Sequence, residues 1–425
     1  MAQEGTIEHH CPCRRVGTGT HQHFFGYYDK HVWDRTGRYL LANRVMMMQT
    51  DLTGEEVAEV GFFDLENGDE FHCLGQTTTW NWQMGCQLQW LEGEQGRRVI
   101  YNTSGTDEGS VHPGFRSTVV DVETGQRRTL PLPVFAVAPN GRDALCIDYS
   151  RLQHTHPTIG YNSVGPTPAL ENAPKDDGIH RMDLITGSVQ LIISLRTLRD
   201  FQPVKSMDNA IHWVTHPVIN PSSMRVLFLH RWTERVEDET CWMHRLFTAN
   251  LDGSDLRLLE CSDHPIPQLL EGFDPNSVGT FDYEKSEYQI SHPIWKDKDH
   301  GMVWGPHDDR IHYHLYDDRS KKVTVVGATS LRENGHMTYS PNGEWILTDT
   351  YPDDETHERN LILYNVAQDR RYDIGSFFAD PTLGKPNRCD LHPRWSRDGR
   401  QVCIDSVHES ERQMYILDVS ELTNR

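Results

Sequence analysis

The chain has 425 residues and a formal net charge of −21, from 62 Asp and Glu against 41 Lys and Arg. This excess of negative charge repels nucleic acid and anionic membrane surfaces, so neither is expected as a partner. Hydrophobic residues make up only 36% with no apolar run of 18 residues, which argues against a transmembrane helix, while 11 Trp, 15 Tyr and 14 Phe argue against a disordered chain.

Residues 1–10 have neither the basic stretch nor the apolar segment of a secretory signal. A cytoplasmic protein is therefore expected, or a periplasmic or secreted one if a signal has been removed. The nine Cys are spread over the whole chain and do not form the dense pattern of a disulfide framework.

Short apolar strands alternate with Gly, Asn and Asp turns along the whole chain. One unit recurs, in which an aromatic or apolar residue precedes a four-residue turn that ends in Gly, and a strand follows. The clearest copies begin at Trp33, Val137, Tyr339 and Trp395. Glycine at the end of the turn supplies the positive φ that a tight hairpin requires.

A second unit follows each of these, a strand that ends in Asp before a Gly turn, as in 63–68, 120–125, 182–187 and 250–253. Two hairpins make a four-stranded antiparallel blade. Blade starts fall near Trp33, Trp90, Val137, Ile219, Trp295, Tyr339 and Trp395. The sequence therefore predicts an all-β fold, one seven-bladed β-propeller domain over 1–425, whose last blade is closed by the N-terminal segment. Even spacing and the lack of linkers favour it over a string of β-sandwiches.

Histidines occupy one position of this repeat, three residues before the anchor of the blade. The residues at that position are His216, His292, His336 and His392, with Gln87 in the second blade. Equivalent positions at the start of the inner strands ring the channel of a propeller. These five side chains are therefore predicted to bind a divalent metal ion, Mn, Zn or Ca. The alternative is that polar residues there only hydrate the channel.

The densest aromatic and titratable stretch is 19–33, which leads into the first blade and is expected to cross one mouth of the channel. Its histidines and tyrosines supply proton acceptors and donors. The alternative is a packed blade interface, which explains the Phe residues but not the ionisable ones. The pairs His154/His156 and His312/His314 are interpreted as surface or hydrogen-bonding histidines.

At the end of a later strand, Arg231 and Trp232 follow His230. A guanidinium beside an indole suits a sugar carboxylate, because the fork binds the acid and the ring stacks on the sugar. A purely structural Arg is the alternative. Residues 80–83 and 101–102 are expected to line the same mouth by their place in the repeat.

Four strings resemble the polysaccharide lyases and relatives with a β-propeller fold, namely the oligogalacturonate lyases, the propeller ulvan lyases and the propeller enzymes acting on rhamnosyl-glucuronate linkages. The strings are 23–30, 82–90, 229–232 and 389–395. The likeness spans the chain, but the turn repeat is shared with many propellers, so only these strings are specific. Oligogalacturonate lyases also hold a metal with His and Gln near the axis, in keeping with the predicted ring.

The resemblance implies β-elimination at a 4-linked uronic acid in an acidic oligo- or polysaccharide. A monomer or weak oligomer is expected. A metal or Arg neutralises the carboxylate, a His or Tyr removes the C5 proton and another protonates the leaving oxygen. The predicted catalytic residues are His21, His23, Tyr28, His230 and Arg231. The predicted substrate-binding residues are Tyr27, Trp82, Gln83, Asn102 and Trp232.

Two other functions stay open. A glycoside hydrolase on the same fold requires paired carboxylates, which the segments at the mouth do not obviously provide, and the Ser-x-Asp-x-Gly-x-Thr-Trp boxes of sialidase-type propellers are missing. A non-catalytic propeller that serves as a binding platform requires neither the histidine ring nor the ionisable N-terminal stretch.

Overall fold

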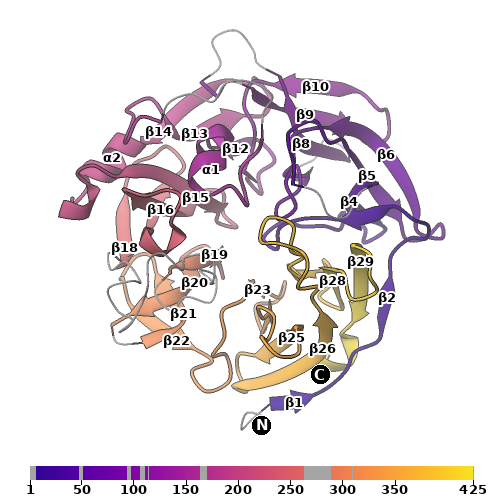
Figure 1. The fold of residues 1–425 in the computed structure, drawn as a ribbon. Helices are drawn as coiled ribbons and strands as arrows, with labels where there is room; N and C mark the ends of the chain where they lie inside the picture. The colour runs from indigo at the N-terminus through magenta and orange to yellow at the C-terminus, as the bar shows by residue number, and fades with distance from the viewer. Residues whose placement is uncertain are drawn as a thin grey trace.

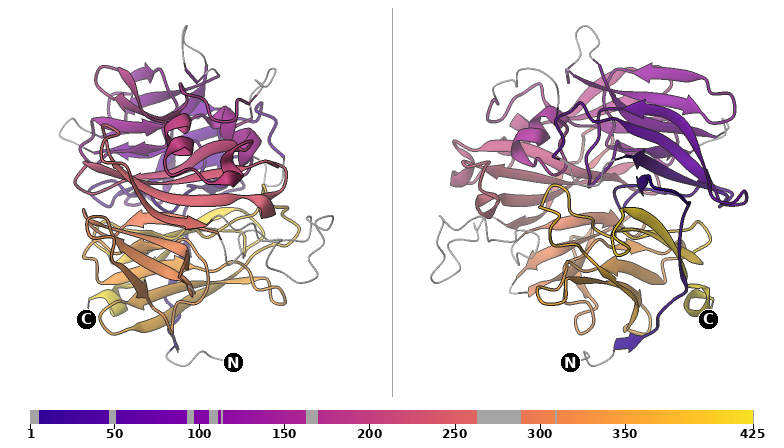
Figure 2. Two further views of the ribbon diagram at one scale, coloured as in Figure 1. Left: turned by 90° about the vertical axis from the view of Figure 1, so that its left-hand side faces the viewer. Right: turned by 45° about the vertical axis from the view of Figure 1, so that its right-hand side comes forward.

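The computed structural model describes residues 6–46, 51–92, 97–105, 111–112, 114–162, 170–262, 289–308 and 310–424. Strands in this part of the chain form seven sheets around a central axis (Figure 1). The predicted seven-bladed propeller of four-stranded antiparallel blades is therefore confirmed. Figure 2 shows the same ring of blades from two sides.

Blades 1 to 7 are numbered in chain order, and the first strand of each lies nearest the axis (Figure 1). Blades 1 to 3 comprise β3 (Gln22–Phe24), β4 (Tyr39–Val45), β5 (Ala58–Asp64) and β6 (Glu70–Thr77); β7 (Gln89–Leu91), β8 (Arg98–Ser104), β9 (Phe115–Asp121) and β10 (Arg127–Leu130); and β11 (Ala136–Val137), β12 (Asp143–Cys146), β13 (Gly178–Asp183) and β14 (Val189–Ser194). Blades 4 and 5 comprise β15 (Ile211–Ile219), β16 (Arg225–Thr233), β17 (Met243–Asn250) and β18 (Arg257–Ser262); and β19 (Ser291–Trp295), β20 (His300–His307), β21 (Arg310–Asp317) and β22 (Val323–Val326).

Blade 6 consists of β23 (Thr338–Tyr339), β24 (Trp345–Asp349), β25 (Glu358–Asn365) and β26 (Arg370–Phe378), and blade 7 contains β27 (Arg394–Trp395), β28 (Gln401–Ser406) and β29 (Gln413–Asp418). The helices are short: α1 (Tyr149–Thr155), α2 (Leu195–Asp200) and α3 (Ser420–Thr423), with 3-10 turns η1 (Lys205–Met207) and η2 (Glu239–Cys241). Helix α1 bears on the site, because it is inserted between β12 and β13 and ends at His156, which lines the cavity at the axis.

The N-terminal segment runs along two blades. Strand β2 (Cys13–Arg15) pairs antiparallel with β29, so it is the outer strand of blade 7. Strand β1 (Thr6–Glu8) pairs in parallel with β26 and adds a fifth strand to blade 6. This pairing joins the two ends of the chain and covers sheet edges that would otherwise be open.

The predicted turn geometry recurs in the structure. In blades 6 and 7 the N–H groups of Gly343 and Gly399 donate to the carbonyls of Ser340 and Ser396 at 2.8 and 3.1 Å. Both glycines have φ near +70° (73° and 72°), which explains why this position carries Gly. In blade 6 the Ser340 hydroxyl also accepts the N–H of Trp345, which fixes the start of the next strand.

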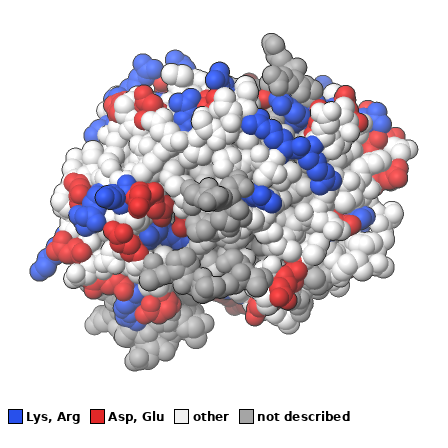
Figure 3. All heavy atoms as spheres, turned by 90° about the horizontal axis from the view of Figure 1, so that it is seen from above, with Lys and Arg blue, Asp and Glu red and all other residues white. Residues whose placement is uncertain are grey.

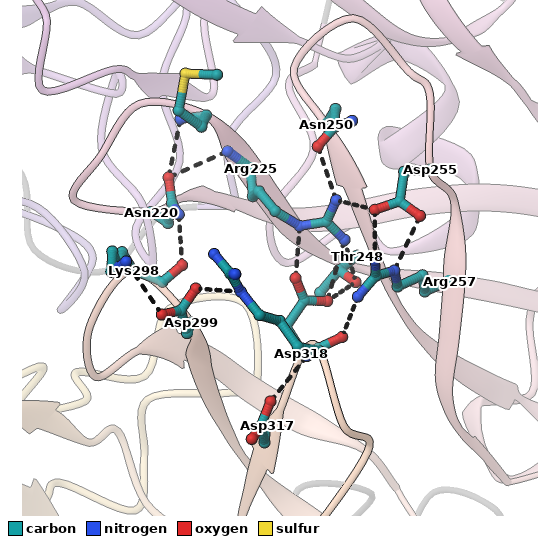
Figure 4. Close-up of polar contacts among 12 residues, drawn as sticks. Asn220, Arg225, Thr248, Asn250, Asp255, Arg257, Lys298, Asp299, Asp317 and Asp318 are labelled. Carbon is teal, nitrogen blue, oxygen red and sulfur yellow. Dashed lines mark hydrogen bonds and ion pairs between the residues drawn. The ribbon is translucent and has the colours of Figure 1, made fainter.

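Adjacent blades are joined by apolar packing and by polar networks at their rims. Between blades 4 and 5, Arg225 forms an ion pair of 2.6 Å with Asp318 and one of 2.9 Å with Asp255 (Figure 4). Arg257 pairs with Asp255 and donates to the carbonyl of Asp318, while the Thr248 hydroxyl bonds the Asp318 carboxylate. The network leaves Asp318 satisfied, so it is a structural contact between blades.

Surface charge and helix length relate to the sequence-based expectation that neither nucleic acid nor a membrane is a partner. On the face in Figure 3, acidic and basic side chains are interspersed among neutral ones, so the excess of acid does not form one continuous field there. No helix in the described ranges is both long and apolar enough to cross a membrane.

Candidate active site at the propeller axis

The four histidines of the repeat position converge at the axis, and all four are buried. The ring of His336 lies 4.3 Å, centroid to centroid, from those of both His292 and His392. His216 joins them through Tyr27, whose ring lies 5.4 Å from that of His216 and 5.0 Å from that of His392. The repeat therefore brings together the four side chains that the sequence aligned.

The backbone at this position is unusual and recurs from blade to blade. His216, His292 and His392 have φ of 54°, 54° and 42°, and Gln87 has 55°. The ladder shifts register at this point in β15 and β19. A non-glycine residue in the left-handed region costs about 1–3 kcal/mol, and such strain gathers at functional sites. The bulge turns the side chain away from the sheet.

His336 reaches the cluster by another route. It follows Gly335, where a Cβ would lie 1.8 Å from the carbonyl oxygen of Asp349, so only glycine fits. The backbone N–H of His336 and its Nδ1 both bond the Asp349 carboxylate, at 2.7 and 2.9 Å. Asp349 also accepts the backbone N–H of His392 at 3.2 Å. One buried carboxylate thus holds two of the four histidines.

In three of the histidines the Nδ1 atom has a fixed partner. The partners are the Thr215 hydroxyl for His216 (2.8 Å), Asn334 Oδ1 for His292 (3.1 Å) and Asp349 for His336. In His392, Nε2 is buried and has no hydrogen-bond partner. A bonded Nδ1 that leaves Nε2 to face inward is the outer-shell arrangement of metal-binding histidines.

Asp390 adds a carboxylate to this group. One ligand atom each from His336, Asp390 and His392 lie within 4.8 Å of one another. Asp390 forms ion pairs with Arg359 at 2.7 Å and Arg388 at 2.8 Å. Burial by itself would raise the pKa of Asp390, but the two arginines hold it well below its usual range, so the carboxylate is ionised.

Residues 25–32 leave the first blade between β3 and the bridge from Trp33 to Leu40 and carry two tyrosines into the axis. The backbone N–H groups of Phe25 and Gly26 donate to Asp405 at 3.2 and 3.1 Å. Asp405 is also paired with the buried Arg394 at 2.7 Å. Blade 7 therefore fixes where this segment enters the channel.

The Tyr27 hydroxyl lies 2.5 Å from His216 Nε2. Burial raises the pKa of Tyr27 well above its usual value and lowers that of His216, with the Arg231 charge lowering the latter further. At neutral pH the imidazole is thus uncharged and accepts a hydrogen bond from the neutral phenol. Tyr28 packs against His292 and His336 and lines a separate cavity of about 520 Å³.

Arg231 on β16 is buried and points toward the axis. It donates to Nδ1 of His244 and of His156, both at 3.1 Å, and to the carbonyl of Ile290 at 3.4 Å. In the described part of the chain no carboxylate pairs with it. Three of its five N–H donors are used, which leaves two for a ligand.

These groups enclose a cavity of about 40 Å³ at the axis, called the axial cavity below. That volume accommodates an ion or one water rather than a sugar ring. Its lining residues are Tyr27, Gln83, His156, Thr158, Ile159, His216, Arg231, Gln289, Ser291, His292, His336, Tyr351, Arg388 and His392.

Other predicted site residues lie elsewhere. His230 and Trp232 alternate with Arg231 along β16, so they point to the opposite face, where His230 stacks on His212. His23 packs on Phe63, and its Nδ1 lies 3.0 Å from Gln413 Oε1. Burial lowers the pKa of His23 to about 4.

The remaining four predicted residues also lie outside the axial cavity. The ring of His21 lies 6.4 Å from that of His23. Trp82 packs on Phe24 and Trp80, and Asn102 bonds the backbone of Val134. Gln87 shares the backbone geometry of the histidines, but its amide donates to the Met84 sulfur at 3.3 Å.

Sequence reasoning missed His156, Tyr351, Arg388 and Asp390 as members of the site. His156 is the C-terminal cap of α1 and bonds Arg231, in line with its interpretation as a hydrogen-bonding histidine. A signal existed, because His156 precedes a proline, as do His216, His292 and His392. For Arg388 and Asp390 the only signal was their proximity to His392 in the chain.

Comparison with known structures adds to this geometry. The chain is similar to an oligogalacturonate lyase from Vibrio parahaemolyticus, with 13% identity, 98% of this chain and 96% of that one covered, and a TM-score of 0.62. It is also similar to an oligogalacturonate lyase in complex with manganese, with 12% identity, coverage of 100% and 98%, and a TM-score of 0.64. Neither a family model nor a curated protein matches the sequence. At these identities the likeness shows the propeller fold.

Proposed function

We propose that the protein is a lyase that cleaves an acidic oligo- or polysaccharide by β-elimination at a uronic acid. The observation that carries the proposal is Arg231, a buried guanidinium at the axial cavity with no carboxylate partner among the described residues. A buried charge without a counter-ion costs several kcal/mol, so such a site suits an anionic ligand. Its two remaining donors match the two oxygens of a carboxylate.

The reaction needs the uronate carboxylate to be neutralised, because only then is the proton on C5 acidic enough to remove. The C5–H bond breaks, a C4–C5 double bond forms and the C4–O bond to the leaving sugar breaks. One group takes the C5 proton and another gives a proton to the leaving oxygen. Electrostatic stabilisation of the developing charge on the carboxylate is the contribution assigned to Arg231.

Tyr27 and His216 are assigned the proton transfers. The neutral imidazole of His216 accepts a proton, and the neutral phenol of Tyr27 donates one. They lie 2.5 Å apart, so a proton taken by one passes to the other over a single hydrogen bond. His21 and His23 lie outside the axial cavity and have no part in this scheme.

A divalent metal fits the residues beside Arg231. His336, Asp390 and His392 would hold it, because two imidazoles and an ionised carboxylate converge there and the buried Nε2 of His392 lacks a partner. The two imidazole donors favour Zn over Ca, and the carboxylate is a ligand that suits Mn. A bound metal would supply a further positive charge for the uronate carboxylate. Support for Mn also comes from the fold neighbour in complex with manganese.

The sugar chain itself needs more room than the axial cavity offers. A cavity of about 340 Å³ adjoins it and shares Tyr351 with it, and it is also lined by Trp304 and Arg332. This volume is in the range of small-ligand pockets. We assign it to the ring of the reacting uronate, whose carboxylate reaches Arg231 in the axial cavity. Arg332 is not assigned to a carboxylate, because Glu333, Asp353 and Glu358 also line this larger cavity.

The lining of the axial cavity does not favour a hydrolase. Inverting and retaining glycosidases both need two carboxyl groups at the cleaved bond. The described residues that line the axial cavity include no Asp or Glu. Asp349 and Asp390 behind them are engaged by histidine and arginine.

The test is a screen of uronate-containing glycans, read by the ultraviolet absorbance of the unsaturated uronate that only a lyase forms. A parallel assay for new reducing ends reports cleavage by any mechanism. Reducing ends without the absorbance would show a hydrolase and overturn the proposal. Binding of uronate glycans without cleavage by metal-loaded protein would show a binding platform and overturn it as well.

A further inference from the structure

A second cluster of metal-binding side chains lies away from the axial cavity. One ligand atom each from His112, Asp177 and His180 lie within 4.8 Å of one another. His112 lies between β8 and β9, Asp177 directly precedes β13, and His180 is in β13. We call these three residues the α1 cluster, because Arg151 of helix α1 contacts it. None of the three lines the axial cavity.

The two imidazoles of the α1 cluster are buried and face each other. Their ring centroids are 4.8 Å apart and the planes are nearly perpendicular, at 89°. His112 is fully buried and His180 is 2% exposed. In the described part of the chain Nδ1 of His180 is shielded from solvent and forms no hydrogen bond. A buried polar group left in this way costs about 1–3 kcal/mol unless a ligand satisfies it.

The carboxylate of the cluster is held in place from the other side. Asp177 Oδ2 accepts from Arg151 Nε at 2.8 Å, and Oδ1 accepts the N–H of Gly178 at 2.6 Å. Oδ1 lies 3.6 Å from His112 Nε2, a separation longer than a hydrogen bond. Two ligand atoms of a metal bound at about 2.0–2.2 Å lie a little over 3 Å apart, so this gap suits a bridging ion.

Charge around the cluster favours a cation. Asp148, the N-cap of α1, is a second carboxylate next to His112 and Asp177, and among the described residues Arg151 is the permanent cation that contacts Asp177. Added positive charge is therefore stabilised by both carboxylates.

We propose that His112, Asp177 and His180 bind a divalent transition metal ion, with Zn²⁺ as the best match and water as the fourth ligand. Two imidazoles, a carboxylate and a water are a common tetrahedral zinc environment. This site is separate from the one at the axis and does not depend on the proposed lyase activity.

The ion stabilises the position of helix α1 through Asp177 and Arg151. Asp177 is tied to Arg151, whose other nitrogens donate to the carbonyls of His212 and Glu171. Seven residues long, α1 ends at His156, which accepts from Arg231 in the axial cavity. A metal bound near the N-terminus of α1 therefore stabilises the position of His156, which lies at the C-terminus of the helix and lines the axial cavity.

The test is direct metal binding to metal-free protein prepared without a polyhistidine tag. Zn²⁺ is titrated by calorimetry, and Co²⁺ replaces it to give a visible spectrum that reports coordination. Wild type is expected to bind two equivalents. His392→Ala, which removes an axial ligand, is expected to retain one equivalent with a tetrahedral Co²⁺ spectrum.

His180→Ala added to His392→Ala is expected to weaken the remaining binding by more than the 10–100-fold typical of an outer-shell loss. His23→Ala, at another buried strand histidine, is the matched control and should leave binding unchanged. Folding is checked by circular dichroism, and if the double variant does not fold, His180→Gln replaces the alanine variant. Retention of only the axial equivalent by wild type, or unchanged Zn²⁺ binding after removal of His180, would overturn the proposal.

Discussion

The Tyr27 hydroxyl is hydrogen-bonded to His216 Nε2 at 2.5 Å across the axis of the propeller. Tyr27 comes from the segment between β3 and β4, and His216 from the bulge in β15 three blades away. The pair exists only because the N-terminal loop enters the channel. It is a direct contact between a proton donor and a proton acceptor at the axial cavity, which is why the proton transfers are assigned to it.

Replacement of Tyr27 by Phe tests this assignment. The ring remains packed among His216, His336 and His392, so the fold should persist while the proton donor is lost. Activity on a uronate glycan is expected to fall by about 10²–10⁴-fold, the usual contribution of a general acid or base. Tyr364→Phe, which removes a hydroxyl bonded to Asp369 at a turn, should retain full activity. Equal activity of the two variants would remove Tyr27 from the mechanism.

Arg231→Lys keeps the positive charge but loses the planar guanidinium with its paired N–H donors. The ammonium has three N–H groups, so it cannot bind both oxygens of a carboxylate while it also donates to His156 and His244, and kcat/KM is expected to fall by about 100-fold or more. The matched control is Arg245→Lys on the neighbouring strand β17, whose buried guanidinium donates to the carbonyls of Phe201 and Gln202. Wild type should also prefer a free uronate to its methyl ester, and Arg231→Lys should lose that preference. A preference unchanged in the variant would contradict the carboxylate role.

Removal of metal tests the axial site. Chelation is expected to abolish activity and lower the melting temperature, and added Mn²⁺ or Zn²⁺ should restore both, since a ligand that binds only the folded state stabilises it. His392→Ala should not recover activity at metal concentrations that restore wild type, whereas His300→Ala, at a surface histidine bonded to Asp297, should behave as wild type. Full activity of protein shown to be free of metal would exclude the axial metal from the reaction.

The fold and the histidine ring followed from one sequence feature, the turn repeat. Because blades superpose, a residue that recurs three positions before each anchor has to recur at one level of the axis, as His216, His292 and His392 do. Repeat position alone could not separate Gln87 from the histidines, because its side chain direction depends on a local contact with Met84.

The rest of the site depends on insertions and alternation, which the repeat does not encode. Tyr27 is placed by Asp405 from blade 7, and His156 by a helix inserted within blade 3. The sequence did not determine which of the neighbouring residues His230, Arg231 and Trp232 points toward the axis. The register of β15 and β16 decides that Arg231, and neither His230 nor Trp232, faces the cavity.

The entry of the N-terminal loop depends on a buried ion pair. Asp405→Asn leaves the guanidinium of Arg394 without its counter-ion and weakens the acceptor of the Phe25 and Gly26 N–H groups. A loss of about 3–5 kcal/mol in the free energy of unfolding is expected. Asp299→Asn, which breaks an exposed pair with Arg319, should cost no more than about 1 kcal/mol. Chemical denaturation of both variants measures the difference, and equal losses would show that the buried pair does not hold the loop.

Stability should fall with acid in part because of His23. Its pKa is lowered from 6.5 to about 4 in the folded protein, chiefly by burial. The unfolded chain therefore binds a proton that the native protein does not, so stability is lost as the pH falls from about 6.5 and the loss levels off below about 4. His23→Gln cannot take up that proton. Between pH 7.5 and 4.5 the variant is expected to lose roughly 2–3 kcal/mol less than wild type in denaturant titrations. Parallel losses in the two proteins would mean that His23 is protonated within the fold.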